Sequence, residues 1–144
     1  ARKKAQAAAL IFPGDVVLAA DTVVFAAGQV LGKPRDPGDA SRMLSLLSGR
    51  VHQVYTGVCV VSGEKLIEGT AVTDVRFSRM SEEEIAFYCA SGEPLGKAGA
   101  YAIQGLGGMF VEEISGSYSN VVGLPTALVR SMLQDASYPI FRRE

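Results

Sequence analysis

The chain has 144 residues, of which 48% are hydrophobic and 20% are charged, and its formal net charge at pH 7 is −1. These values are ordinary for one soluble globular domain, and the small net charge gives no electrostatic reason to expect nucleic acid or a membrane surface as a partner. No apolar run approaches the roughly 18 residues that a membrane-spanning helix needs. The two cysteines, Cys59 and Cys89, suit a reducing compartment, which predicts a cytoplasmic protein without a disulfide.

The first third of the chain predicts a helix, short strands and a second helix. Residues 1–9 are rich in alanine and strongly helical. Two short strands are predicted at residues 16–20 and 22–26 with Asp21 between them, and a further extended piece at residues 29–31. Prolines disfavour regular structure just after that piece, and apolar residues at three- and four-residue spacing then predict a helix that begins at Asp36 or Gly38 and stops at Gly49.

A long β-hairpin follows, with arms at residues 51–61 and 66–77. Its first arm is rich in Val, Thr and Tyr, and imperfect alternation in the second arm predicts a bulge near Asp74. Ser81 and Glu84 have the spacing of a capping box, which predicts a helix from there to about Ala90.

The last third of the chain predicts a glycine-rich loop, a strand and a helix. The glycine-rich segment runs to Gly108 and leads into a strand at residues 109–114. A final helix is predicted to start near Asn120, with Pro125 in its first turn.

Two segments carry the chemistry that could form a site. Lys97 and Gln104 flank a run made mostly of Ala and Gly in which Tyr101 is the only aromatic residue, so polar groups there can approach a ligand closely. Asp21 follows an apolar run that is typical of a buried strand, and a buried charge is costly unless it is paired, holds a metal or faces a cleft. Together they suggest a site where a metal and phosphates meet.

Plainer interpretations exist for each of these residues. Asp21 could be a turn aspartate bonded to neighbouring amides, Lys33 a solvated lysine, and Gln104 a partner of backbone groups. Lys97 alone says little, and the single histidine, His52, is more often structural than catalytic in such a position. The sequence contains no Ser-His-Asp set, no Cys/His cluster for zinc and no Walker loop. Carboxylates and lysines remain, the set suited to chemistry on phosphates with a hard metal ion.

The pieces in this order resemble the Maf family of nucleotide pyrophosphatases, first known as septum-formation inhibitors. The resemblance spans nearly the whole chain. The matching residues are Lys4-Ala5, Ala20-Asp21-Thr22-Val23-Val24, Gly32-Lys33-Pro34, Met43-Leu44, Leu47-Ser48-Gly49, His52 to Val58, Ser81 to Ile85, Tyr88, Glu93-Pro94, Lys97 to Tyr101, Ile103-Gln104-Gly105, Gly116-Ser117-Tyr118 and Asn120 to Pro125.

The resemblance implies an α/β fold, with a long mixed sheet bent around a central cleft and flanking helices, similar to the inosine-triphosphate pyrophosphatases. It implies hydrolysis of a nucleoside triphosphate to the monophosphate and pyrophosphate, with Mg²⁺ or Mn²⁺ as cofactor and often as a homodimer. The family opens with a strand and a Ser-x-Ser-Pro-Arg-Arg phosphate loop, followed by a glutamate that helps to hold the metal. Residues 1–144 are therefore expected to form a single Maf-like domain that lacks its N-terminal strand and phosphate loop, with uncertain activity as it stands.

Carried over by position, the family's roles fall on six residues. Asp21 is the expected catalytic carboxylate and metal ligand. Substrate binding is assigned to Lys4, Lys33 and Lys97, the first two as cations on the phosphate side. Thr22 and Gln104 are the expected specificity positions.

The base preference depends on Gln104. Its side chain offers both a donor and an acceptor, which suits the imide edge of thymine or uracil. Together with Lys33 in the Gly-Lys-Pro motif, it resembles the branch of the family that hydrolyses dTTP and UTP, which implies a pyrophosphatase for these and for modified pyrimidine triphosphates. The 7-methyl-GTP branch of the family typically has Glu at that position and is the alternative enzyme. A non-catalytic nucleotide-binding regulator of cell division is the alternative from another functional class.

Overall fold

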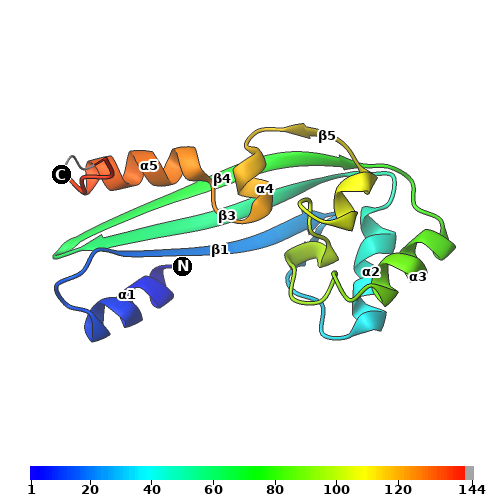
Figure 1. Ribbon diagram of the computed structural model, residues 1–144, viewed down its shortest axis with the longest axis horizontal. Coiled ribbons are helices and arrows are strands. Elements are labelled where there is room, and N and C mark those ends of the chain that lie inside the picture. Colours follow the sequence, from blue (N-terminus) through cyan, green and yellow to red (C-terminus); the bar gives the residue numbers. More distant parts are fainter. Residues whose placement is uncertain (142–144) are drawn as a thin grey trace.

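The computed structural model describes residues 1–141 and is built on one five-stranded sheet in the order β2-β1-β3-β4-β5 (Figure 1). The strands are β1 (Val17–Ala26), β2 (Gln29–Leu31), β3 (Val51–Ser62), β4 (Lys65–Phe77) and β5 (Val111–Ser115). The helices are α1 (Arg2–Ile11), α2 (Pro37–Leu47), α3 (Glu82–Ala90), α4 (Tyr118–Val122) and α5 (Thr126–Asp135), with 3₁₀ turns η1 (Ala98–Ala100) and η2 (Leu106–Phe110). The predicted α/β class is confirmed, although the four strand pairings are all antiparallel and not mixed.

The molecule is elongated and has two differently built ends. At one end, α2, α3 and the 3₁₀ turns pack against the sheet around the largest apolar cluster, whose fully buried members include Leu44, Phe77 and Tyr88. At the other end, β1, β3 and β4 extend as a long ribbon, with α1 and α5 beside it (Figure 1). None of the helices within residues 1–141 has the length and apolar character needed to cross a lipid bilayer.

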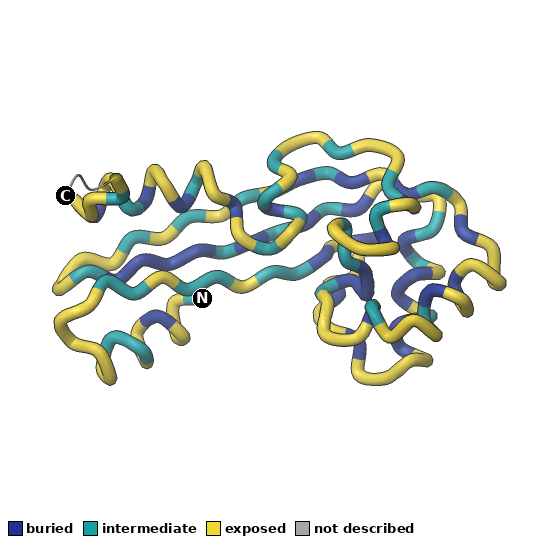
Figure 2. Tube along the Cα trace, in the orientation of Figure 1, coloured by how far each residue is buried: buried dark blue, intermediate teal, exposed yellow. Residues whose placement is uncertain are grey.

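The central strand β3 explains why the ribbon needs both flanking helices. Its residues Val58 and Val60 pack with Val129 and Met132 of α5, whereas Cys59 and Val61 pack with Ala5 of α1. Successive side chains of a strand point to opposite faces, so a run with every residue apolar requires cover on both sides. Figure 2 shows the resulting buried stretch along β3, which lies between more exposed neighbouring strands.

Several local signals act as the sequence predicts. The helix predicted to begin at Asp36 or Gly38 begins at Pro37, where the Asp36 side chain caps it by accepting a hydrogen bond from the Asp39 amide at 2.7 Å. Ser81 and Glu84 form the predicted capping box of α3. Gly49 follows α2 with a positive φ of 66°, as expected of a glycine at a helix stop.

The structure differs from four predictions about the elements. Asp21 does not separate two strands but lies inside the continuous strand β1, and it is exposed. The bulge predicted near Asp74 is absent from the β3–β4 pairing, and the irregularity lies between Arg76 and Phe77, where β4 meets β5. The predicted strand at residues 109–114 starts only at Val111, because η2 occupies the preceding residues.

The fourth correction concerns the predicted final helix, which is two helices. Gly123 ends α4 with a φ of 127°, a backbone conformation that no α-helix contains, and Pro125 precedes α5 as its N-cap. The break brings the carbonyl oxygen of Gly123 within 3.5 Å of the Thr22 hydroxyl on β1, and residues 121–123 line the candidate site described below.

Candidate functional site

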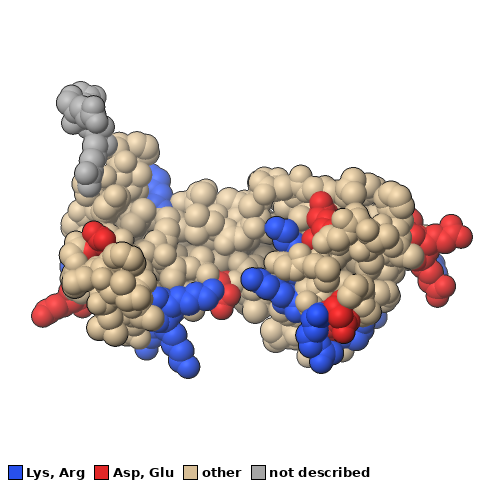
Figure 3. Space-filling model, turned by 60° about the horizontal axis from the view of Figure 1, so that its bottom comes forward, with Lys and Arg blue, Asp and Glu red and all other residues tan. Residues whose placement is uncertain are grey.

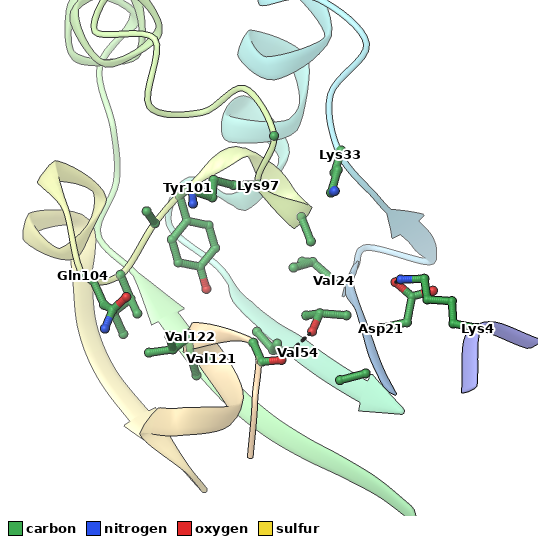
Figure 4. A pocket seen from close by; sticks show the side chains of 17 residues that line it. Lys4, Asp21, Val24, Lys33, Val54, Lys97, Tyr101, Gln104, Val121 and Val122 are labelled. Carbon is green, nitrogen blue, oxygen red and sulfur yellow. Dashed lines mark hydrogen bonds and ion pairs between the residues drawn. The ribbon is translucent and has the colours of Figure 1, made fainter. Parts of the chain in front are cut away.

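A cavity of about 310 Å³ opens beside β1, and all six predicted site residues line it. Segments that are far apart in the sequence meet there: α1, β1, the loop before α2, the stretch around η1 and the end of α4 (Figure 4). Its lining residues are Lys4, Ala20, Asp21, Thr22, Val24, Lys33, Val54, Gly96, Lys97, Ala98, Tyr101, Ala102, Ile103, Gln104, Val121, Val122 and Gly123. In Figure 4, Gln104 lies on one side of the cavity and Asp21 with Lys4 on the other, with Tyr101 between them.

The cavity follows the free edge of β1. Strand β2 pairs with β1 only from Val24 to Ala26, so the stretch from Val17 to Val23 has β3 on one side and no described strand on the other. Neighbouring residues of a strand face opposite sides of the sheet, and Asp21 and Thr22 are such neighbours. A ligand at this edge can therefore contact both faces of the sheet at once.

Asp21 belongs to the face that α1 covers. Its carboxylate Oδ1 lies 3.6 Å from Nζ of Lys4, and both side chains are 62% exposed. An ion pair this exposed adds little to stability, and its carboxylate stays accessible to water. The expectation that Asp21 ends a buried strand is therefore wrong, because β1 continues through it and is only partly covered on that face. Asp21 is nevertheless paired with Lys4 and lines the cavity, which are two of the three arrangements expected for it.

Thr22 belongs to the opposite face and is held by two contacts. Its Oγ1 lies 2.9 Å from Oγ1 of Thr56, the residue paired with it on β3, and donates to the Gly123 carbonyl oxygen at 3.5 Å. Thr56 is fully buried. These contacts join β1, β3 and the end of α4 on the cavity side of the sheet.

Lys33 and Lys97 come from two loops that are joined by their backbones. The Gly99 amide donates to the Gly32 carbonyl oxygen at 3.1 Å, one residue before Lys33. Gly99 has a φ of 72°, and a Cβ there would lie 2.7 Å from Cγ2 of Val24. Only glycine combines this backbone conformation with such close packing on β1, so Gly99 fixes the separation between the two lysine-bearing loops and the sheet.

Tyr101 has a buried partner behind the cavity. Nε2 of His52 lies 2.7 Å from the Tyr101 hydroxyl oxygen, and both rings contact Phe77 edge to face. Burial lowers the pKa of His52 to about 4, so the ring is neutral at pH 7. Its Nδ1 has no hydrogen-bond partner in the described residues. An unpaired lone pair is tolerated better than an unpaired N–H, which favours the tautomer whose Nε2–H donates to Tyr101.

The charges around the cavity favour an anion. Three lysines and one aspartate are its charged lining residues within the part of the chain that the structure describes. Figure 3 shows Lys and Arg side chains on both sides of the narrow middle of the molecule, with acidic atoms between them. Several cations around one open cavity attract a polyanion such as a polyphosphate.

Two residues that matter for the site were not identified from the sequence as parts of it. Thr56 holds Thr22, and Glu93 binds the loop that carries Gln104. The register that pairs Thr56 with Thr22 cannot be read from either strand alone. Glu93 lies in a matching motif of the resemblance, but its partners come from a loop more than ten residues away.

Comparisons with known proteins agree with this picture. A family model described as Maf-like protein matches residues 1–136. A protein of Anaeromyxobacter dehalogenans (strain 2CP-C) named dTTP/UTP pyrophosphatase is 53% identical over 144 residues, which cover 97% of this chain and 72% of the relative. A protein with the same name from Shewanella denitrificans is 52% identical, over 92% of this chain and 69% of the relative. Another from Pyrococcus furiosus is 46% identical, over 93% of this chain and 70% of the relative. The chain therefore belongs to the Maf family.

Proposed function

We propose that the protein hydrolyses dTTP and UTP to the nucleoside monophosphate and pyrophosphate. The observation that carries this proposal is the cavity at the edge of β1, where a carboxylate, three lysines and an amide side chain surround one open space. Relatives at about half identity carry the name dTTP/UTP pyrophosphatase, which supports the same reaction.

In the proposed reaction, a water oxygen attacks the α-phosphorus and the bond from that phosphorus to the bridging oxygen breaks. The bridging oxygen leaves with the pyrophosphate, and the water loses a proton. Asp21 is the proposed group that orients this water and accepts the proton, because its carboxylate is exposed at the cavity edge and bonded only loosely to Lys4. Lys33, Lys97 and Lys4 are proposed to balance the charge that builds up on the leaving pyrophosphate.

The proposed pyrimidine preference rests on Gln104 and Thr22. Gln104 lies on the side of the cavity away from Asp21 and can pair with both a carbonyl and an N–H of the imide edge (Figure 4). Thr22 also lines the cavity, and its hydroxyl is held by Thr56 and Gly123. A purine would occupy more of the cavity and present a different hydrogen-bond pattern to Gln104.

A divalent cation, Mg²⁺ or Mn²⁺, fits this site only together with the substrate. Within residues 1–141, no group of three or more His, Cys, Asp or Glu side chains is placed to hold a metal ion. Mg²⁺ in nucleotide sites is commonly held by one or two carboxylates and the substrate phosphates, and Asp21 is the carboxylate available here. Such an ion would neutralise charge on the phosphates. We expect EDTA to abolish activity and added Mg²⁺ or Mn²⁺ to restore it, and full activity in metal-free buffer would contradict this assignment.

Pyrophosphate release from a panel of triphosphates tests the proposed function directly. We expect dTTP and UTP to be hydrolysed in preference to dGTP, dATP and 7-methyl-GTP, and Gln104→Glu to reduce that preference. In water labelled with a heavy oxygen isotope, the label should enter the monophosphate, since the attack is at the α-phosphorus. Preference for 7-methyl-GTP would indicate the other branch of the family, and nucleotide binding without hydrolysis would indicate a regulator.

We also propose, from the family resemblance alone, that the protein acts as a homodimer. Sedimentation velocity at several protein concentrations would test this, and a monomer at all of them would contradict it.

A further inference from the structure

The loop that carries Gln104 is bound to α3 through Ala102, the first residue of the loop. Tyr88 lies on α3 with its side chain almost fully buried. Its hydroxyl accepts a hydrogen bond from the Ala102 amide at 3.1 Å and donates to the carboxylate of Glu93. Tyr88 therefore fixes the backbone two residues before Gln104 and also orients Glu93.

Glu93 fastens the same loop on the other side of Gln104. Its Oε1 accepts from the Leu106 amide and its Oε2 from the Gly107 amide, each at 3.0 Å. The loop also closes on itself, because the Gly105 amide donates to the Ala102 carbonyl oxygen at 3.1 Å. Gln104 thus lies between two fixed points, and its own side chain stays exposed at the cavity.

The glycines of this loop match the two side chains that hold it. A Cβ at Gly105 would lie 1.8 Å from Oε1 of Glu93, and a Cβ at Gly107 would lie 2.5 Å from the Tyr88 hydroxyl. Contacts this short cannot occur, so a larger residue would require the loop or the side chain of Glu93 or Tyr88 to move and would disturb their hydrogen bonds. The small residues that follow Gln104 are explained by the approach of these two side chains.

The protonation states suit this arrangement. Partial burial acts to raise the pKa of Glu93, but hydrogen bonds from Tyr88 and from the Gly107 and Leu106 amides, with the charge of Lys97, outweigh it and lower the pKa. Burial, and then the hydrogen bond to Glu93, raise the pKa of Tyr88. At neutral pH, an ionised Glu93 accepts three hydrogen bonds and a protonated Tyr88 donates one, and bonds to an ionised acceptor are stronger than neutral ones.

We propose that Glu93 and Tyr88 are positioning residues that set the base preference of the site by holding the Gln104 loop in place. Neither residue lines the cavity, so both act through Gln104. The proposal rests on the proposed function, because it takes the preference for a pyrimidine as the property that the loop controls. A site that pairs polar groups with one base edge loses discrimination when those groups are displaced.

The kinetic test uses Glu93→Gln and Tyr88→Phe. A glutamine keeps the shape of Glu93 but presents an amide donor to groups that need an acceptor, and phenylalanine keeps the packing of Tyr88 without its hydroxyl. We expect each to lower the ratio of kcat/KM for dTTP to that for dGTP by about tenfold or more. The matched controls are Glu112→Gln on β5 and Tyr55→Phe on β3, which change the same groups outside the cavity and should leave the ratio unchanged.

A double-variant comparison separates positioning from a general effect on the fold. If Glu93 acts only through Gln104, then Glu93→Gln should not lower the dTTP-to-dGTP ratio further in a Gln104→Ala background. A full additional loss in that background would overturn the proposal. So would an unchanged ratio in both Glu93→Gln and Tyr88→Phe.

Hydrogen exchange tests the same idea without any variant and without substrate. In the unaltered protein, the amides of Ala102, Leu106 and Gly107 should exchange slowly, because Tyr88 and Glu93 accept their hydrogen bonds, although Ala102 lies outside the helices and strands and Leu106 and Gly107 only begin the short η2. Fast exchange at Leu106 and Gly107 would overturn the proposed positioning whatever the protein hydrolyses. Slow exchange at these amides with no hydrolysis of dTTP would instead count against the proposed function and leave the loop contacts intact.

Discussion

At the scale of single residues, Asp21 is the side chain on which the proposed chemistry depends most. We expect Asp21→Asn to lower kcat for dTTP by about a hundredfold or more, since general-base catalysis contributes at least that much and asparagine cannot accept the proton. Stability and nucleotide affinity should change little, because the carboxylate is 62% exposed and its ion-pair partner Lys4 is equally exposed.

Steady-state kinetics, thermal unfolding and binding of a slowly hydrolysed dTTP analogue would check this expectation. Asp15→Asn, in the exposed turn between α1 and β1, is the matched control. If Asp21→Asn retained a tenth of the turnover of the unaltered protein, Asp21 would not be the base.

Lys33 should contribute to the transition state from its place at the rim of the cavity. We expect Lys33→Ala to raise the activation barrier for dTTP by roughly 2–4 kcal/mol, the size of effect found when one charge-stabilising group is removed from an active site. Lys65→Ala, an exposed lysine at the distal end of β4, should have no such effect. If Lys33→Ala changed kcat and KM only a few-fold, Lys33 would be a solvated surface lysine with no role in the reaction.

The individual site residues could be named from the sequence because their motifs resemble a family, and the structure brings all six to one cavity. The physical argument for one of them was nevertheless wrong. The sequence predicts that a buried strand ends at Asp21, but β1 continues through it and one edge of the strand is open there. Whether a strand has a neighbour on each side depends on the sheet and not on its own residues.

At the scale of secondary-structure elements, caps and glycine stops could be predicted, and breaks that depend on tertiary contacts could not. The capping box of α3, formed by Ser81 and Glu84, and the glycine stop of α2 at Gly49 are signals whose residues lie within a few positions of each helix end. The break between α4 and α5 is different. Gly123 takes its positive φ where its carbonyl oxygen meets Thr22, a residue about one hundred positions away.

The η1 element permits a prediction about how the lysine-bearing loops are spaced from β1. Gly99→Ala should destabilise the protein by about 1–3 kcal/mol, because the new methyl group would meet Val24 at 2.7 Å in a backbone conformation that already disfavours alanine. We also expect a loss of activity, because moving the loop displaces Lys97 and weakens the hydrogen bond to Gly32.

Gly28→Ala is the matched control, because Gly28 has a similar φ of 77° but open space where the Cβ would go. The difference between the two variants in the free energy of unfolding by urea isolates the contact with Val24 from the backbone strain. Equal destabilisation and equal activity in both variants would show that the close packing of Gly99 has no effect of its own.

At the scale of the whole molecule, the cavity exists because two differently built ends of one sheet meet beside β1. The helical end supplies Lys33, Lys97 and Gln104, while α1 of the ribbon end supplies Lys4 (Figure 1). The antiparallel register of β1 on β3 places Thr56 behind Thr22. Neither the meeting of these segments nor the register of β1 on β3 follows from local sequence patterns, since each depends on how segments separated by tens of residues pack together.

The acid stability of the whole molecule should depend on His52, the single histidine of the chain. Burial lowers its pKa in the folded state to about 4 from an ordinary value of 6.5. Below pH 6.5 the unfolded chain therefore binds a proton that the folded protein does not, and the free energy of unfolding falls as the pH drops towards 4. Asp39 and Glu93 have lowered pKa values, so the stability that they contribute is lost only below about pH 4.5.

We expect the free energy of unfolding to fall by about 2 kcal/mol between roughly pH 7.5 and pH 5 through this one group. Urea unfolding at both pH values would measure the fall, and His52→Gln should remove most of it whatever its effect on stability at neutral pH. A glutamine does not titrate, and its amide can still donate to the Tyr101 hydroxyl that His52 contacts at 2.7 Å. An equal fall in the free energy of unfolding in the unaltered protein and in His52→Gln would mean that other groups cause the loss of stability at acid pH. It would also mean that the buried ring takes up a proton without unfolding the core.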